Sequence, residues 1–193
     1  IVGGAGVSGL IAASRAAELG AQVLVVEKME RPGRKLLITG KGRCNITNTA
    51  EQSEYYKHIQ PRGRFLKHAF SRFFSEEIIQ LLGDYGVETK EERGGRVFPS
   101  SNRSEDVLEA LLKKARDYGV KFRFGCRINK VLSENNHVKG IEILQNDQTE
   151  NITAHNIILC TGGKSYPATG SEGEGYQLAS ALGHSVTPVR PAL

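Results

Sequence analysis

Hydrophobic and polar residues repeat along this chain with the periods of strands and helices. Two uninterrupted apolar runs, 23–26 and 157–160, predict parallel strands covered on both faces, the second of them a central strand. Before the first run, apolar residues recur every three to four positions, which predicts an amphipathic helix. Its expected buried face consists of Val7, Leu10, Ala13 and Ala17. With a short strand at Ile1 and Val2, the chain begins as a β-α-β unit.

The same patterns place the other elements. Helices are expected at 54–58, 65–74, 76–85 after an N-cap at Ser75, 105–118 after an N-cap at Ser104, and 175–182. Strands are expected as a hairpin at 87–98 around 93–95, at 120–124, and as a small antiparallel meander at 128–132, 138–144 and 151–153. The fold class predicted is α/β: a Rossmann-like domain with a central parallel sheet, helices and an antiparallel β-meander.

A glycine-rich turn, residues 4–9, joins the first strand to the first helix. Its G-x-G-x-x-G spacing, between a strand and a helix, matches the dinucleotide fingerprint. We expect Gly4 to make the tight turn, Gly6 to let the backbone approach a pyrophosphate, and Gly9 to let the helix lie close to the strands. The N–H groups at the helix start face the anion, so Val7 and Ser8 are candidate cofactor contacts.

An acidic residue ends the second strand. Glu27 lies 18 residues after Gly9, where a carboxylate accepts hydrogen bonds from an adenosine ribose. A 2′-phosphate about 4 Å away would cost about 4 kcal/mol at an effective dielectric of 20. FAD or NAD is therefore favoured over NADP, and the adjacent Lys28 is included among the candidate cofactor contacts.

The stretch from Met29 to Asn48 combines four helix-breaking residues with five cations, and we interpret it as a long ordered loop around a phosphate-bearing ligand. A solvated charged loop is the alternative. The glycines and cations of the stretch that are candidate cofactor contacts are Gly33, Arg34, Lys35, Gly42 and Arg43.

Composition narrows the class of protein. With 193 residues, 39% of them hydrophobic and 24% charged, the chain is typical of a globular domain, and no apolar run is long enough to span a bilayer. We attribute the net charge of +5 to an anionic cofactor, because we find no long Lys/Arg tract and no basic stretch interleaved with aromatic residues. Cys44, Cys126 and Cys160 form no C-x-x-C pair, which argues against disulfides and zinc and favours the cytoplasm.

Three segments, 33–48, 95–101 and 160–184, resemble the bacterial FAD-dependent flavoproteins called NAD(P)/FAD-dependent oxidoreductases, some of them aminoacetone-oxidase-like, which are related to the flavin domains of fumarate reductase and glutathione reductase. The resemblance implies that residues 41–45, among them Cys44 and Asn45, approach the isoalloxazine side of FAD. It implies that Ile128 offers backbone groups to adenine, and that Thr161, Gly162 and the following Gly163 pack on the adenosine half. A cation such as Lys41 or Arg43 near the flavin N1 would then stabilise reduced, anionic flavin, and Arg43→Ala would lower the reduction potential. It also implies that residues 1–193 are the N-terminal part of an FAD-binding domain, without the inserted substrate domain and the C-terminal return segment. The chain end, 189–193, reads as the middle of a longer chain. The family usually has Asp where this chain has Glu174, which puts a tight contact from that position in doubt.

The sequence thus predicts the FAD-binding part of a cytoplasmic flavoprotein oxidoreductase, inactive as a fragment, with NAD(P)H as a candidate co-substrate. Expected partners are a small-molecule substrate and the rest of its own chain, with no membrane, no nucleic acid and no metal. The alternatives are an NAD-binding sensor module and an RNA-modifying flavoenzyme. We identify no catalytic acid or base: the histidines are scattered, and Tyr166, beside Pro167, is interpreted as a packing residue rather than a substrate contact.

Overall fold

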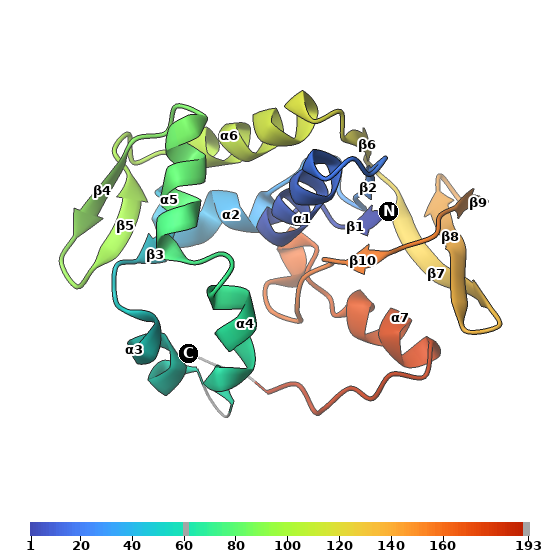
Figure 1. The fold of residues 1–193 in the computed structure, drawn as a ribbon. Helices are drawn as coiled ribbons and strands as arrows, with labels where there is room; N and C mark the ends of the chain where they lie inside the picture. Colours follow the sequence, from blue (N-terminus) through green and yellow to red (C-terminus); the bar gives the residue numbers. More distant parts are fainter. Residues whose placement is uncertain (60–61, 191–193) are drawn as a thin grey trace. The chain divides into compact units, whose positions relative to one another are not determined.

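The computed structural model describes residues 1–59 and 62–190, which form two compact units. Unit 1 comprises Ile1–Lys35 and the chain from Lys114 onward, and unit 2 comprises Leu36–Lys113. Figure 1 labels their helices and strands. The chain end 189–193 was interpreted above as the middle of a longer chain, and its last three residues, 191–193, lie outside the described residues.

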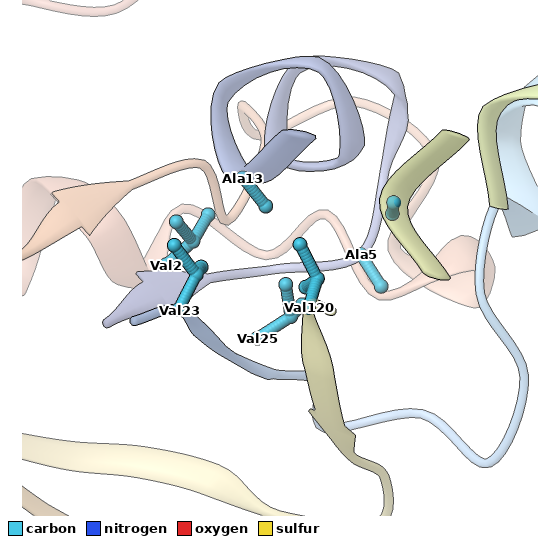
Figure 2. Close-up of a cluster of buried hydrophobic side chains, with 7 residues drawn as sticks. Val2, Ala5, Ala13, Val23, Val25 and Val120 are labelled. Carbon is cyan, nitrogen blue, oxygen red and sulfur yellow. The ribbon is translucent and has the colours of Figure 1, made fainter. Parts of the chain in front are cut away.

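Unit 1 contains the predicted parallel sheet. Its strands β1 (Val2–Gly3), β2 (Leu24–Val26), β6 (Lys121–Arg123) and β10 (Ile158–Leu159) run parallel in the order β10-β1-β2-β6. Helix α1 (Val7–Glu18) connects β1 to β2 and places Ala13 in a buried cluster with Val2, Val25 and Val120, which Figure 2 shows. Burial of these small side chains fixes the helix against the sheet, so the turn before α1 lies at the carboxyl ends of the strands.

Two details of unit 1 differ from the prediction. Strand β10 is not central: it lies at one end of this sheet as formed by the described residues, and Ile158 is 42% exposed. An apolar run indicates a strand but not its position in a sheet, which depends on pairing with distant residues. Val7, in the first turn of α1, is 39% exposed rather than buried, while Leu10 and Ala13 are buried as expected.

The predicted meander is confirmed as a separate three-stranded antiparallel sheet: β7 (Arg127–Glu134), β8 (His137–Gln145) and β9 (Gln148–Thr153). Both hairpins turn on two residues with positive φ, at 135–136 and 146–147, as tight type I′ turns require. Ile128, Ile141 and Ile143 pack with Leu178 of helix α7 (Glu174–Ala181), which follows the short 3₁₀ helix η3 (Pro167–Thr169). The meander and α7 thus share one hydrophobic core with β2.

Unit 2 has a small antiparallel sheet and several helices. The strands β3 (Thr47–Asn48), β4 (Thr89–Glu92) and β5 (Arg96–Pro99) pair in the order β3-β5-β4, and the expected hairpin at 87–98 is confirmed. The helical elements are α2 (Arg34–Ile38), which begins in unit 1, η1 (Thr39–Gly42), α3 (Gln52–His58), η2 (Gly63–Leu66), α4 (Lys67–Phe70), α5 (Ser75–Asp84) and α6 (Ser104–Asp117), which ends in unit 1.

Several local predictions for this part of the chain are wrong. The stretch 29–48 is not a continuous loop, because its apolar residues form α2 with Leu36 buried. The expected helix 65–74 is broken into η2 and α4, which ends at Phe70. Ser75 and Ser104 are the first residues of their helices rather than N-caps, since their hydroxyls donate to distant carbonyls, of Asn48 at 2.7 Å and of Leu37 at 3.1 Å.

The cysteines, the helix lengths and the grouping of possible metal ligands complete the description of the fold. Cys44, Cys126 and Cys160 are free thiols. Within the described residues no helix is long and apolar enough to cross a membrane, and no group of three or more His, Cys, Asp or Glu residues is placed to hold a metal ion.

Candidate functional site

The glycine turn of unit 1 has three glycines with different structural roles. Gly4 has φ +104°, and a Cβ there would lie 2.4 Å from the carbonyl oxygen of Cys160. A Cβ at Gly9 would lie 1.9 Å from the carbonyl oxygen of Gly4. Both positions therefore exclude any side chain, and both are needed for the turn itself.

Gly6 is different, and it provides the test of whether a dinucleotide fits. It caps α1 with φ −78° and ψ −179°, an extended conformation open to any residue, and a Cβ there would meet nothing within 4 Å. The backbone requires no glycine here, and the space that a Cβ would take lies beside the start of α1, whose first N–H groups have no acceptor within the helix. A group that comes closer than a Cβ allows, such as a pyrophosphate, fits this arrangement.

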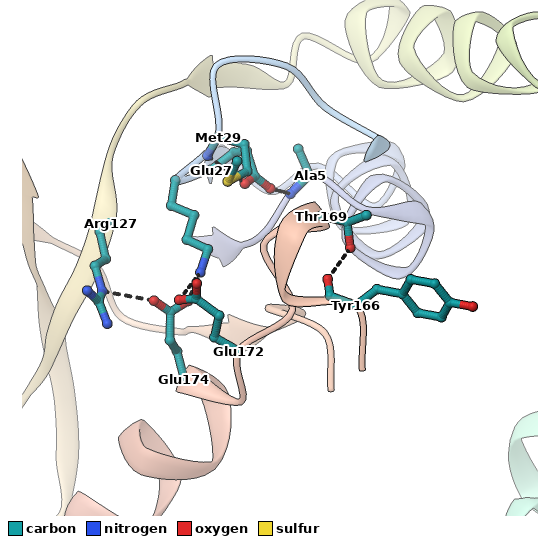
Figure 3. A network of polar contacts seen from close by, with 9 residues as sticks. Ala5, Glu27, Met29, Arg127, Tyr166, Thr169, Glu172 and Glu174 are labelled. Carbon is teal, nitrogen blue, oxygen red and sulfur yellow. Dashed lines mark hydrogen bonds and ion pairs between the residues drawn. The ribbon is translucent and has the colours of Figure 1, made fainter. Parts of the chain in front are cut away.

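Glu27 points toward the same turn. Its Oε2 accepts a hydrogen bond from the Ala5 N–H at 2.7 Å and its Oε1 accepts one from the Met29 N–H at 2.8 Å, as Figure 3 shows. A carboxylate has about four acceptor positions, so two remain for ribose hydroxyls. Gly33 joins the group, because its N–H donates to the Ala5 carbonyl at 3.0 Å. The structure thus brings Gly4, Gly6, Gly9, Glu27 and Gly33 together where β1 and β2 end.

Lys28 forms ion pairs with two carboxylates of its own unit. Its Nζ lies 3.0 Å from Glu172 Oε2 and 2.9 Å from Glu174 Oε2. Desolvation by burial lowers the pKa of Lys28, but hydrogen bonds and charges from Glu174 and Glu172 outweigh it and raise the pKa above its ordinary value. Arg127 Nε lies 2.8 Å from Glu174 Oε1, on the other side of that buried carboxylate (Figure 3). Lys28 is held in an ion-pair cluster, so its part in cofactor binding stays a prediction.

Sequence reasoning did not find this cluster. It marked Glu174 only as a departure from the resembling family and did not single out Glu172 or Arg127. The longer Glu174 side chain makes two close contacts here, both with cations of its own unit. The available signal was an acidic pair around a glycine at the start of a helix, which does not name its partners.

Lys35 and Tyr166 lie near one another in unit 1. Lys35 Nζ donates to the Ser165 carbonyl at 2.9 Å and lies 5.9 Å from the centroid of the Tyr166 ring. The interpretation of Tyr166 as a packing residue is wrong, because its side chain is 65% exposed. Its backbone has φ +58°, a left-handed conformation that is uncommon for a bulky residue, and its carbonyl accepts a hydrogen bond from Thr169 Oγ1 at 2.8 Å. Arg34 is exposed at the start of α2.

The candidate adenosine contacts are also in unit 1. Gly162 has φ +80°, and a Cβ there would lie 2.8 Å from Ser171 Oγ; a Cβ at Gly175 would lie 2.5 Å from Thr161 Oγ1. The chain after β10 therefore packs closely against the start of α7. Ile128 is buried, with its Cδ1 beside Gly3 in β1. Gly163 lies next to Tyr176, the third residue of α7.

Four other candidates lie in unit 2: Gly42, Arg43, Cys44 and Asn45. Arg43 is engaged inside this unit. Its NH1 and NH2 donate to the two Glu92 oxygens at 2.9 and 3.2 Å, and its guanidinium lies 4.1 Å from the centroid of the Phe98 ring. Through these contacts Arg43 anchors the segment 39–44 to β4 and β5. Within that segment Lys41 and Cys44 have positive φ, and the Lys41 side chain is exposed. A role of either cation beside the flavin stays a prediction.

Two of the thiols have pKa values above the ordinary range of a thiol. Burial raises the pKa of Cys44, partly offset by a hydrogen bond with Thr39, and burial likewise raises the pKa of Cys160, partly offset by Ser8. Thiols that stay protonated near neutral pH attack slowly. Burial and a raised pKa both argue against a redox role for Cys44.

The chain matches known proteins over almost its whole length. Residues 1–190 match the family described as HI0933-like protein Rossmann domain. The 3-dehydro-bile acid delta(4,6)-reductase of Clostridium scindens is 37% identical over 100% of this chain and 46% of its own length. The ribosomal RNA dihydrouridine synthase of Haemophilus influenzae is 33% identical over 100% of this chain and 47% of its own length. The chain thus spans about half the length of these curated relatives.

A solved structure supports the fold. The chain is similar to the open conformation of a flavocytochrome c3 fumarate reductase. The alignment covers 94% of this chain and 39% of the fumarate reductase chain, with 21% identity and a TM-score of 0.65. The predicted α/β Rossmann-like fold and the resemblance to bacterial FAD-dependent flavoproteins are confirmed, and FAD is the cofactor of this class of domain. By its match over residues 1–190, this chain belongs to the HI0933-like protein Rossmann domain family.

Proposed function

We propose that this chain binds the diphosphate of FAD at the Gly4–Gly9 turn and the adenosine ribose at Glu27. The observation that carries the proposal is the open backbone at Gly6, where no feature of the fold itself requires glycine. The N–H groups opening α1 donate to the phosphates, and the positive end of the helix dipole favours their charge. Glu27, fixed by two backbone N–H groups, presents its other acceptor positions to the ribose hydroxyls.

We propose further that the natural protein is a reductase of carbon–carbon double bonds conjugated to a carbonyl group. This operation is common to the two names above: the delta(4,6) bonds of a 3-dehydro bile acid, and the uracil ring bond that is saturated in dihydrouridine. When bound, FAD would supply the hydride for this saturation, with a proton completing the new C–H bonds and NAD(P)H as the reductant.

A conjugated enone of steroid size is the first candidate substrate, because the more similar of the two relatives is named for a bile acid. A uridine in RNA is the second candidate. It is favoured by the dihydrouridine synthase relative and by the net charge of +5, which suits a polyanionic partner.

The FAD-loaded natural protein tests both candidates. We expect NAD(P)H to bleach the flavin absorbance under anaerobic conditions, and a conjugated enone or a uridine-containing RNA to restore it with one saturated product per flavin. Saturated product from neither substrate, with the flavin fully reduced, would contradict the proposed reaction. A protein without flavin would contradict the binding proposal as well.

A further inference from the structure

The positive charge of this chain is concentrated in one segment of unit 2. Between Glu54 and Phe74 the sequence has five Lys or Arg residues and a single carboxylate, an excess of +4 beside a total of +5 for the whole chain. Glu54 pairs with Lys57 in α3. The other four cations, Arg62, Arg64, Lys67 and Arg72, are exposed, and within residues 1–59 and 62–190 none has an ion-pair partner.

Aromatic rings in the same segment divide into two sets. Tyr55, Tyr56, Phe70 and Phe74 pack on one another, with centroid distances from 4.8 to 5.9 Å, and form the interior contact between α3, α4 and the start of α5. Phe65, in η2, is 84% exposed. An apolar ring this exposed, with Arg64 beside it in the chain and Lys67 two residues on, is not explained by packing within the unit.

We propose that Phe65 and the four cations Arg62, Arg64, Lys67 and Arg72, here called the basic patch, bind single-stranded RNA. Cations that contact phosphates, beside an aromatic ring on which a base stacks, are the two features of single-strand recognition. From the sequence we expected a helix at 65–74 and found no basic stretch interleaved with aromatic residues, and the exposed Phe65 among exposed cations corrects that expectation. The inference rests on the second substrate candidate, a uridine in RNA.

A membrane surface fits the basic patch less well. Binding to a bilayer through an amphipathic helix needs a continuous apolar face. Here α3 and α4 have seven and four residues, and their aromatic face is used inside unit 2. What remains outside is one ring among cations, which suits a base and its phosphates better than a lipid layer.

The test uses the FAD-loaded natural protein and a fluorescent single-stranded RNA of about 20 nucleotides, titrated at several salt concentrations. If each cation contacts one phosphate, each contributes about 0.7 to the salt slope. The triple variant R64E, K67E and R72E should lower the slope by about 2 and weaken binding roughly 100-fold at 0.1 M salt. A matched charge reversal elsewhere, R93E, K121E and K130E, changes the same number of exposed cations and should leave binding within about threefold.

Replacing Phe65 separates stacking from other contacts. Phe65→Leu keeps an apolar side chain but removes the ring, and it should weaken RNA binding roughly 5- to 150-fold, while Phe65→Tyr should retain it. Equal weakening by the two charge reversals, or tight binding by Phe65→Leu, would overturn the proposal. Binding of phosphatidylglycerol vesicles without binding of RNA would also overturn it. So would a lower melting temperature of the triple variant, because it would show that these cations contact another part of the protein instead of RNA.

Flavin content and NAD(P)H oxidation are measured on every variant. If these stay normal while the patch variants bind RNA unchanged, the inference fails and FAD binding stands. If the unaltered protein holds no flavin, the proposed function fails first.

Discussion

Replacing Gly6 by Ala separates binding from folding. Ala adopts φ −78° and ψ −179° without strain, and its Cβ would meet nothing within 4 Å. Ala is a poorer N-cap than Gly by roughly 0.5–1 kcal/mol, but it lowers the entropy of the unfolded chain by about 0.4–1 kcal/mol. We therefore expect the free energy of unfolding of G6A to stay within about 1 kcal/mol of the unaltered protein.

FAD binding should respond differently. The new methyl group would occupy the space through which phosphate oxygens approach the N–H groups of α1. Losing one charge-assisted hydrogen bond costs about 1.5–3 kcal/mol, which corresponds to a roughly 10- to 150-fold higher Kd. The assay is a titration of the flavin-free natural protein with FAD, followed by flavin fluorescence, beside urea unfolding of the same sample.

Two further glycines provide controls. Gly9→Ala would place a Cβ 1.9 Å from the Gly4 carbonyl oxygen, so it should unfold or severely destabilise the protein. Gly83→Ala changes an exposed position of α5 where a Cβ would again meet nothing within 4 Å, and it should raise stability by about 0.5–1 kcal/mol without affecting FAD. A G6A protein that is stable and binds FAD within about threefold of the unaltered protein would refute the reasoning.

Other changes test the surroundings of the turn. Glu27→Ala removes the acceptor of two backbone N–H groups and should lower the free energy of unfolding by about 1.5–3 kcal/mol and weaken FAD binding, measured by urea unfolding and titration; unchanged values in both assays would exclude Glu27 from this role. Glu174→Gln leaves Lys28 with one carboxylate and should cost about 1–3 kcal/mol of stability, whereas an unaltered unfolding curve would show that the ion-pair cluster contributes nothing. Because burial raises the pKa of Cys44 and Cys160, iodoacetamide at about pH 8 should modify both more slowly in the folded protein than in urea, by mass spectrometry; equal rates would contradict their burial.

The β-α-β unit was predictable because its signals are local. Residues close in sequence predict the strand 23–26, the helix that follows the glycine turn and the acidic strand end at Glu27. Asn and Asp at 135–136 and 146–147 likewise indicate the hairpin turns. Glycine spacing also located the turn. It did not show that Gly4 and Gly9 leave no room for a Cβ within the fold, whereas Gly6 has open space beside it. That distinction depends on atoms of residues as distant as Thr161.

The errors share a long-range cause. Lys28 meets Glu174 across 146 positions, and the Ser104 hydroxyl reaches Leu37, so neither partner is written in the local sequence. Strand β10 was placed at the centre of the sheet from apolarity alone, but strand order depends on pairing. Tyr166 was interpreted as a packing residue, but it has a left-handed backbone and its ring is exposed to solvent.

The most direct test of the account is the identity of the ligand held by the natural protein as purified. Absorbance between about 350 and 500 nm and mass spectrometry of the ligand released by heat would be measured together, with the protein concentration determined independently. We predict flavin bands and one FAD per chain, retained on gel filtration. A colourless protein that takes up NAD but not added FAD would contradict the central claim that the Gly4–Gly9 turn and Glu27 bind a flavin dinucleotide.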